Sequence, residues 1–181
     1  MFTQEEIRIA NATYRSKGSS VFDKDGNVRS VVARFVASNI GKDKKILDFG
    51  CGYEFVQGKY LINLGFDVSG WDIGDNKPEG CADKLEQIYD VVYASNVLNV
   101  ISSDSMLTET IEQIRGCLKD DGMFIANFPQ SPRKMKISSD ELSSIIKEKF
   151  GGTAHKISGT SCPMWIFTKS NVNIERMNVG A

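Results

Sequence analysis

The chain has 181 residues, 41% of them hydrophobic and 25% charged, and its formal net charge is −1. This length predicts one domain with a sizeable core, and the balanced charge excludes a global attraction to nucleic acid, which would need a local basic patch. The four cysteines form no C-x-x-C pair and no metal-ligand spacing, so we expect free thiols and no metal site. The opening residues are acidic where a signal peptide is basic, and no run reaches the length of a membrane span, so we expect a soluble, cytoplasmic protein.

Helical and strand periods alternate along the chain, which is typical of an α/β sheet. Thr3 and Glu6 predict a capping box for the first helix, and Asn27 is expected to cap the second. The periods predict a helix over 4–15, a helix over 28–38, a strand over 45–49, a helix over 54–64, a strand over 66–73, a reduced third strand within 76–88, a strand over 89–94, a helix over 103–118, a strand over 123–128, a helix over 139–150, and strands over 153–158 and 164–169.

These elements predict three parts of unequal size. Residues 1–27 are expected to form an N-terminal helix and a lid segment, and residues 28–170 the main domain. Residues 171–181 show no period and are expected to trail as a C-terminal tail.

The most informative segment is KILDFGCGYE at 45–54, an apolar strand that runs into an acidic residue and two glycines. Glycines at the carboxyl end of a buried parallel strand let backbone N–H groups approach a nucleotide-type cofactor. Asp48 would repel a pyrophosphate but would suit a cofactor that carries an ammonium group and hydroxyls. Phe55 stands where the dinucleotide fingerprint needs its third glycine, and the chain has no Walker pattern.

The D-x-G-x-G pattern at Asp48, Gly50 and Gly52 resembles motif I of the class I S-adenosylmethionine-dependent methyltransferases. The resemblance implies that these three residues surround the methionine part of the cofactor. Many family members carry a further glycine where this chain has Glu54. Either the loop lies differently here, or Glu54 begins the next helix and favours its N-terminal dipole.

Asp72 follows Asp48 by 24 positions and ends the next predicted strand. A carboxylate at that strand end is placed to accept hydrogen bonds from both ribose hydroxyls of a nucleoside. The alternative is a surface Asp that opens a turn. By the resemblance, Asp83 would take the acidic position on the adenine side, although a solvated Asp is an equal alternative.

The segment SNVLNV at 95–100 follows the strand that corresponds to the family's fourth, beside the methyl to be transferred. It lacks the D-P-P-Y motif of amino-methylating DNA enzymes, and no Pro-Cys pair supports a cytosine-C5 mechanism. We expect Ser95, Asn96 and Asn99 to hold the methyl acceptor as catalytic residues. The cofactor-binding residues that the resemblance implies are Asp48, Phe49, Gly50, Cys51, Gly52, Asp72, Ile73, Asp83, Ser95 and Asn96.

Three cations, Arg133, Lys134 and Lys136, follow two prolines in the loop after the 123–128 strand. The loop either forms an acceptor-side lip that binds a nucleic acid or is a solvated polar loop. His155, the only histidine, and Trp165 are expected to be structural rather than catalytic or base-stacking.

A segment before the domain carries further candidate residues. Tyr14, Arg15 and Lys17 lie where methyltransferases often fold a lid, and Arg15 would there meet the methionine carboxylate. An exposed helix end is the alternative.

Taken together, the resemblance implies a three-layer α/β sandwich with a Rossmann-like, mostly parallel seven-stranded sheet, an antiparallel last strand and a reduced third strand. It implies an enzyme that uses S-adenosyl-L-methionine, releases S-adenosyl-L-homocysteine and methylates an unassigned acceptor, either a nucleic acid or a small molecule. Two other hypotheses stay open: a non-catalytic S-adenosylmethionine-binding regulatory protein, and a dinucleotide-dependent oxidoreductase, against which Asp48 and Phe55 argue.

Overall fold

The computed structural model describes residues 2–14, 23–24, 28–73, 81, 85–86, 88–131 and 133–170. Its elements are α1 (Gln4–Tyr14), α2 (Val31–Asn39), β1 (Lys45–Phe49), α3 (Val56–Asn63), β2 (Asp67–Trp71), β3 (Tyr89–Ala94), the 3₁₀ turn η1 (Leu98–Val100), α4 (Asp104–Cys117), β4 (Leu118–Asn127), α5 (Ser139–Phe150), β5 (Thr153–Lys156) and β6 (Met164–Thr168). No helix in these ranges is long and apolar enough to cross a membrane.

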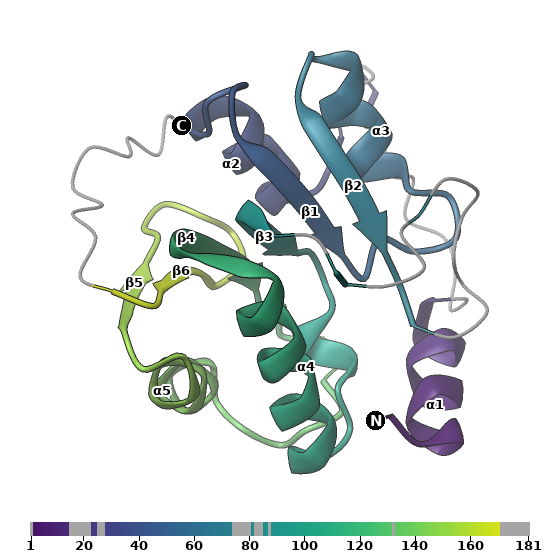
Figure 1. Ribbon diagram of the computed structural model, residues 1–181. Coiled ribbons are helices and arrows are strands. Elements are labelled where there is room, and N and C mark those ends of the chain that lie inside the picture. The colour runs from purple at the N-terminus through teal and green to yellow at the C-terminus, as the bar shows by residue number, and fades with distance from the viewer. Residues whose placement is uncertain are drawn as a thin grey trace.

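The strands form one mixed sheet in the order β2-β1-β3-β4-β6-β5, with helices on both sides (Figure 1). Strands β2, β1, β3 and β4 run parallel, whereas β6 is antiparallel to both β4 and β5. The Rossmann-like α/β sandwich with an antiparallel last strand is therefore confirmed. The structure describes six strands, because most of the segment 76–88, where the reduced third strand was expected, lies outside the described residues.

Each face of the sheet buries its own apolar cluster because side chains alternate along every strand. Leu47 and Phe49 of β1 pack on the α4 and α5 side with Phe124 and Phe150. Ile46 of the same strand points to the opposite side, where the buried side chains of α2 and α3 pack. The four parallel strands, from β2 at one side of the sheet to β4, are thus covered on both faces, and polar groups collect along their carboxyl ends.

Two helix starts differ from the sequence prediction. Helix α2 begins at Val31 rather than at 28, because the Ser30 hydroxyl, at 3.2 Å, accepts the hydrogen bond from the Ala33 N–H. Asn27, the expected cap, lies outside the described residues. Helix α3 begins at Val56, after Phe55 in a left-handed conformation, so the prediction that Glu54 begins this helix is wrong.

Strand β4 begins directly after α4, whereas the sequence predicted a strand that starts only at 123, with four residues between it and the end of the helix. Leu118 pairs with Tyr89, and the next paired residues are Met123 and Val91, so the intervening residues form a bulge in the ladder. Because of the bulge, β4 starts beside the amino end of β3 and still places Asn127 at the carboxyl edge of the sheet.

Helix α1 packs against η1, and its Glu6 is hydrogen-bonded to Ser103 and Ser105 at the start of α4. The expected capping box is present: the Thr3 N–H donates to Glu6 at 2.8 Å, and the Glu6 N–H donates to the Thr3 hydroxyl at 3.2 Å. The Ser103 hydroxyl also donates to Glu6 at 2.5 Å, and these bonds lower the pKa of Glu6 to about 2. Arg15, Lys17 and the side chain of Tyr14 lie outside the described residues.

Candidate functional site

The loop after β1 turns through its two glycines. Gly50 and Gly52 have φ values of 76° and 69°, a region that L side chains rarely adopt. The N–H groups of Gly50 and Cys51 both donate to the Trp71 carbonyl, at 2.8 and 3.1 Å, which fixes the loop to the end of β2. A Cβ atom at Gly50 would lie 2.4 Å from Val97 Cγ2, so the loop also packs closely against the segment after β3.

Asp72 joins this loop to the carboxyl end of β2. Its Oδ2 accepts a hydrogen bond from the Gly52 N–H at 2.6 Å, and its Oδ1 accepts one from the Ile73 N–H at 2.7 Å. The side chain is only 8% exposed, and burial raises the pKa of Asp72 to about 6 despite these two bonds. A surface turn residue would be solvated, so the alternative that Asp72 is such a residue is wrong.

Asp48 is the most deeply buried carboxylate of the site, with 2% of its surface exposed. Burial raises its pKa to about 7, and the nearby Asp72 raises it further; the Tyr93 hydroxyl and the Gly58 N–H lie close enough to lower it, although neither forms a hydrogen bond to Asp48 Oδ2. Its Oδ2 has no hydrogen-bond partner among the described residues, and neither has the buried Tyr93 hydroxyl. Tyr93 faces Asp48 because the two residues are register partners on adjacent strands. An unpaired carboxylate oxygen in such a setting favours a cationic ligand.

Phe55 explains how a chain without the third glycine still makes this turn. Phe55 adopts φ 50°, the left-handed conformation for which glycine is usual. Its ring is buried against two glycines, since a Cβ atom on Gly58 or Gly70 would lie 1.8 or 2.8 Å from Phe55 Cε2. Packing of the ring thus offsets the backbone strain.

A second polar group forms at the ends of β3 and β4. Asn96 has φ 60°, and its N–H donates to Asn127 Oδ1 at 2.7 Å. The Asn127 amide in turn donates to Asn96 Oδ1 at 2.8 Å. Ser95, next to Asn96, shares a 2.9 Å hydroxyl contact with Ser30. Hydrogen bonds between neutral groups therefore hold this half of the edge together, while the Asn96 side chain itself is exposed.

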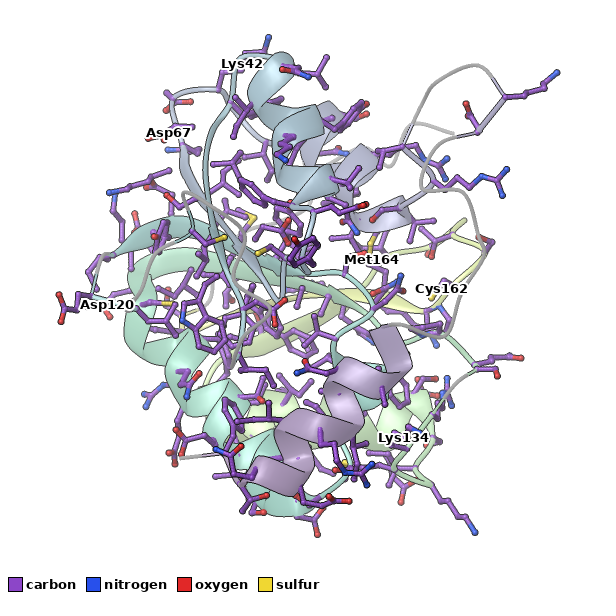
Figure 2. All side chains as sticks on the ribbon, turned by 90° about the vertical axis from the view of Figure 1, so that its right-hand side faces the viewer. Lys42, Asp67, Asp120, Lys134, Cys162 and Met164 are labelled. Atoms are coloured by element: carbon purple, nitrogen blue, oxygen red, sulfur yellow. The ribbon has the colours of Figure 1, made fainter. Side chains whose placement is uncertain are left out.

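The loop after β4 returns across this second group. The Lys134 N–H donates to the Asn99 carbonyl at 3.0 Å, so the loop lies beside η1. Arg133 points inward: its guanidinium donates to the Pro129 and Phe128 carbonyls at 2.8 and 3.1 Å and lies 4.0 Å from the Phe128 ring centre. Lys134 and Lys136 are exposed, and Figure 2 shows Lys134 at the periphery of the molecule.

The structure brings most of the predicted residues to one edge of the sheet. Asp48, the glycine loop and Asp72 meet at β1 and β2, and Ser95, Asn96 and Asn99 lie at β3 and η1. The Phe49 side chain lies in the core, 4.5 Å from Trp71 between ring centres, so only its backbone faces this edge. Asp83 lies outside the described residues.

Three contributors escaped the sequence analysis as site residues: Asn127, Ser30 and Tyr93. Asn127 had a readable signal, because a polar residue ending the apolar run MFIA marks the carboxyl edge. Ser30 and Tyr93 had none, since each acquires its role from a partner distant in sequence.

Trp165 lies in the core as expected, and His155 lies far from the glycine loop. Trp165 is 3% exposed and packs in the core. His155 lies exposed on the outermost strand, β5, separated from β1 by three strands, and contacts the Thr153 hydroxyl at 3.2 Å. Among the described residues no three His, Cys, Asp or Glu side chains gather as a metal site.

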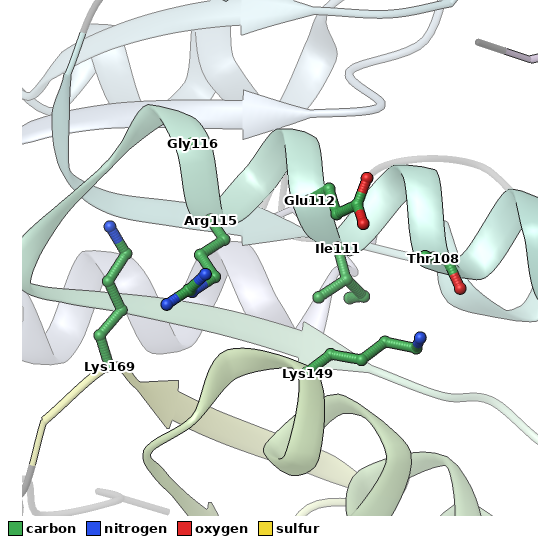
Figure 3. A pocket seen from close by; sticks show the side chains of 7 residues that line it. All are labelled: Thr108, Ile111, Glu112, Arg115, Gly116, Lys149 and Lys169. Carbon is green, nitrogen blue, oxygen red and sulfur yellow. The ribbon is translucent and has the colours of Figure 1, made fainter.

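A groove of about 470 Å³ lies away from this edge, between α4 and α5 (Figure 3). Its lining residues are Thr108, Ile111, Glu112, Arg115, Gly116, Lys149 and Lys169. Arg115 and Lys149 lie in the last turns of their helices, where cations interact favourably with the helix dipole. Lys169 donates to the Leu118 carbonyl at 2.5 Å. The positions of these three cations are thus explained by the carboxyl ends of α4 and α5, through the helix dipoles and the carbonyl of Leu118, the C-cap residue of α4.

Comparison with known proteins agrees with this geometry. A family model described as a methyltransferase domain matches residues 23–145. No curated protein sequence matches the chain. The fold is similar to a TehB-like S-adenosylmethionine-dependent methyltransferase from Corynebacterium glutamicum, with TM-score 0.60 and 18% identity, over 80% of this chain and 90% of that one.

Two further solved structures are similar in fold. A methyltransferase from Bacteroides fragilis in complex with S-adenosyl-L-homocysteine has TM-score 0.56 and 15% identity, over 89% of this chain and 92% of that one. A 16S rRNA N2 G1207 methyltransferase from T. thermophilus in complex with AdoMet and guanosine has TM-score 0.54 and 14% identity, over 80% of this chain and 44% of that one. The chain belongs to the methyltransferase-domain family, with the fold of the class I S-adenosylmethionine-dependent enzymes.

Proposed function

We propose that this protein transfers a methyl group from S-adenosyl-L-methionine to an acceptor held at the ends of β3 and β4. The observation that carries the proposal is the pair of buried carboxylates, Asp48 and Asp72, on either side of the Gly50–Gly52 turn. In a cofactor that carries both an ammonium group and a ribose, the ammonium group would interact with Asp48 and the ribose hydroxyls with Asp72.

The residues present fit such a cofactor. Asp48 Oδ2 is buried and has no partner in the described part of the chain, so a cation nearby would offset its desolvation. Asp72 uses one lone pair of each oxygen for a backbone N–H, and a carboxylate oxygen retains further acceptor capacity for hydroxyls. The glycine loop presents backbone, without side chains at Gly50 and Gly52, to the same edge.

When bound, S-adenosylmethionine supplies a methyl group made electrophilic by the sulfonium, so the protein needs no nucleophile of its own. The roles left to this chain are to orient the acceptor in line and to exclude water. Asn96 is the best placed residue, because its exposed side chain is held by the buried Asn127. Ser95 and the Asn99 carbonyl, which lies beside the loop at Lys134, complete the acceptor side.

The acceptor is either a nucleic acid or a small molecule. For a nucleic acid, the exposed Lys134 and Lys136 are the residues that would meet phosphates, and Arg133 would stay in its inward position. The similarity in fold to an rRNA methyltransferase crystallised with guanosine is compatible with this acceptor.

An assay for transfer of labelled methyl tests both the proposed activity and the class of acceptor. The full chain would be incubated with methyl-labelled S-adenosylmethionine and with separate fractions of nucleic acid, protein and small metabolites. Label should appear in the nucleic-acid or metabolite fraction with wild type and with the exposed control Asp67→Ala, and should fall with Asp72→Ala at subsaturating cofactor. A nucleic-acid acceptor further predicts that the double variant Lys134→Ala/Lys136→Ala lowers transfer several-fold, with a smaller salt dependence.

Two other functions give different outcomes. A non-catalytic regulatory protein would bind S-adenosylmethionine but label no fraction. A dinucleotide-dependent oxidoreductase would prefer NAD, which Asp48 disfavours because it lies where the pyrophosphate would bind.

A further inference from the structure

Two thiols meet beside the glycine loop. Cys51, between Gly50 and Gly52, and Cys81 have their sulfurs 3.3 Å apart, although 30 positions separate them in sequence. Neither is in a disulfide, and both are partly exposed. The resemblance to methyltransferases assigns no role to these two thiols as a pair.

The surroundings hold the two sulfurs in this arrangement. Cys81 Sγ lies against β2, since a Cβ atom on Gly70 would come within 2.6 Å of it. The Phe55 ring lies against the same glycine, and Cys51 packs on the apolar cluster that contains this ring. Cys51 is fixed from the other side, because its N–H donates to the Trp71 carbonyl at 3.1 Å.

We infer that Cys51 and Cys81 form an oxidative modification site, a dithiol that closes to a disulfide and thereby lowers cofactor affinity. The oxidant belongs to the class of hydroperoxides. One sulfur, after losing its proton, attacks a peroxide oxygen, which breaks the O–O bond and gives a sulfenic acid and water. The second sulfur then displaces the hydroxyl as a second water, and the S–S bond forms. Two thiols lose two electrons in total, and one hydrogen peroxide is reduced to two waters.

Closure has a structural consequence for the cofactor loop. A disulfide bond is about 2.05 Å long, so the sulfurs must approach by more than 1 Å. Cys51 lies next to Gly52, whose N–H donates to Asp72, and the movement therefore shifts the contact between the loop and its carboxylate. The expected loss of affinity rests on the proposed function, whereas formation of the disulfide does not.

Oxidation of this pair is expected to be slow. Burial, with the charge of Asp48, raises the pKa of Cys51, so its reactive thiolate is scarce at neutral pH. The pair should therefore stay reduced without added oxidant and close only on prolonged exposure to peroxide, and the 3.3 Å separation of the sulfurs favours closure over further oxidation of either one.

Peptide mapping tests the disulfide directly. The reduced full chain would be treated with excess hydrogen peroxide over a time course of hours, blocked with N-ethylmaleimide and digested with trypsin. Cys51 and Cys81 fall in separate peptides, 46–59 and 60–84, and Cys117 and Cys162 fall in 116–119 and 157–169. We expect a crosslink between 46–59 and 60–84 that dithiothreitol removes. Absence of that crosslink would overturn the inference.

Calorimetry with S-adenosyl-L-homocysteine tests the consequence. Affinity should fall about tenfold or more on oxidation and return with dithiothreitol, because displacement of a binding loop by about 1 Å has effects of this order or larger. Cys81→Ser should lose both the crosslink and the redox effect, whereas Cys162→Ser should retain both. A crosslinked protein with unchanged affinity would refute the inference. Failure of the reduced wild type to bind would instead contradict the proposed function, and the peptide map would still decide the disulfide.

Discussion

The two halves of the sheet's carboxyl edge satisfy their polar groups in different ways. At β1 and β2 the groups are carboxylates, buried and with raised pKa values, and Asp48 Oδ2 has no partner among the described residues. At β3 and β4 the groups are neutral, and Asn96 and Asn127 satisfy each other. The first half gains from a cationic ligand, whereas the second must exchange existing bonds for those of an acceptor. The half at β1 and β2 is therefore expected to bind the methyl donor strongly, and the half at β3 and β4 to discriminate between methyl acceptors.

The largest expected effect follows removal of Asp72. Asp72→Ala deletes the acceptor of two backbone N–H groups and the proposed ribose contact. Affinity for S-adenosyl-L-homocysteine should fall by about 1–3 kcal/mol, measured by calorimetry. Asp67→Ala, an exposed change at the start of the same strand, is the control and should leave affinity unchanged. Equal affinities for the two variants would contradict the ribose role.

At Asp48 we expect a smaller effect: a rise in pH should lower the stability of the protein but raise its affinity for the cofactor. Its folded pKa of about 7 lies above its ordinary value, so the unliganded protein should lose stability as pH rises from about 4 to about 7. Cofactor affinity should instead rise about tenfold between pH 6 and 8, where Asp48 ionises in the folded protein, because the ionised form attracts the ammonium group.

Asp48→Asn separates these two consequences. The variant should be more stable than wild type at pH 8, by thermal unfolding, yet bind the cofactor more weakly and without the pH dependence. A wild-type affinity that does not change between pH 6 and 8 would show that Asp48 faces no cation.

Substitutions in the neutral half, at the ends of β3 and β4, should lower stability and leave cofactor affinity almost unchanged. Asn127→Ala leaves the Asn96 N–H without its acceptor, so the free energy of unfolding should fall by about 1–3 kcal/mol, while cofactor affinity changes less than twofold. Asn96→Gly relieves the positive φ and is the matched variant that keeps the backbone N–H. If Asn127→Ala weakened cofactor binding as much as Asp72→Ala, the two halves would not be independent.

The sequence was enough to predict the elements that have strong local signals. Helix α5 has the bounds expected, because Ser138 and Glu141 form a capping box around a regular apolar period. Asp72 was identified from its place at a strand end, and in the structure it is buried beside the glycine loop. These features depend on neighbours within a few residues or on one register of the sheet.

What the sequence could not predict depends on contacts across the fold. Phe55 adopts the conformation of a glycine because Gly58 and Gly70, from two other elements, make room for its ring. Arg133 resembles a phosphate ligand in sequence, yet carbonyls of its own loop bind its guanidinium. The contact between Cys51 and Cys81 follows from the return of the chain to β2 and has no motif spacing.

The carboxylate half of the edge, Asp48 with Asp72, is proposed to bind S-adenosylmethionine rather than a dinucleotide. Calorimetry on the reduced full chain at pH 8, with S-adenosyl-L-homocysteine and NAD titrated separately, tests it most directly. We expect saturable binding of S-adenosyl-L-homocysteine and at least tenfold weaker binding of NAD, because Asp48 would repel the pyrophosphate. Preferential binding of NAD would contradict it.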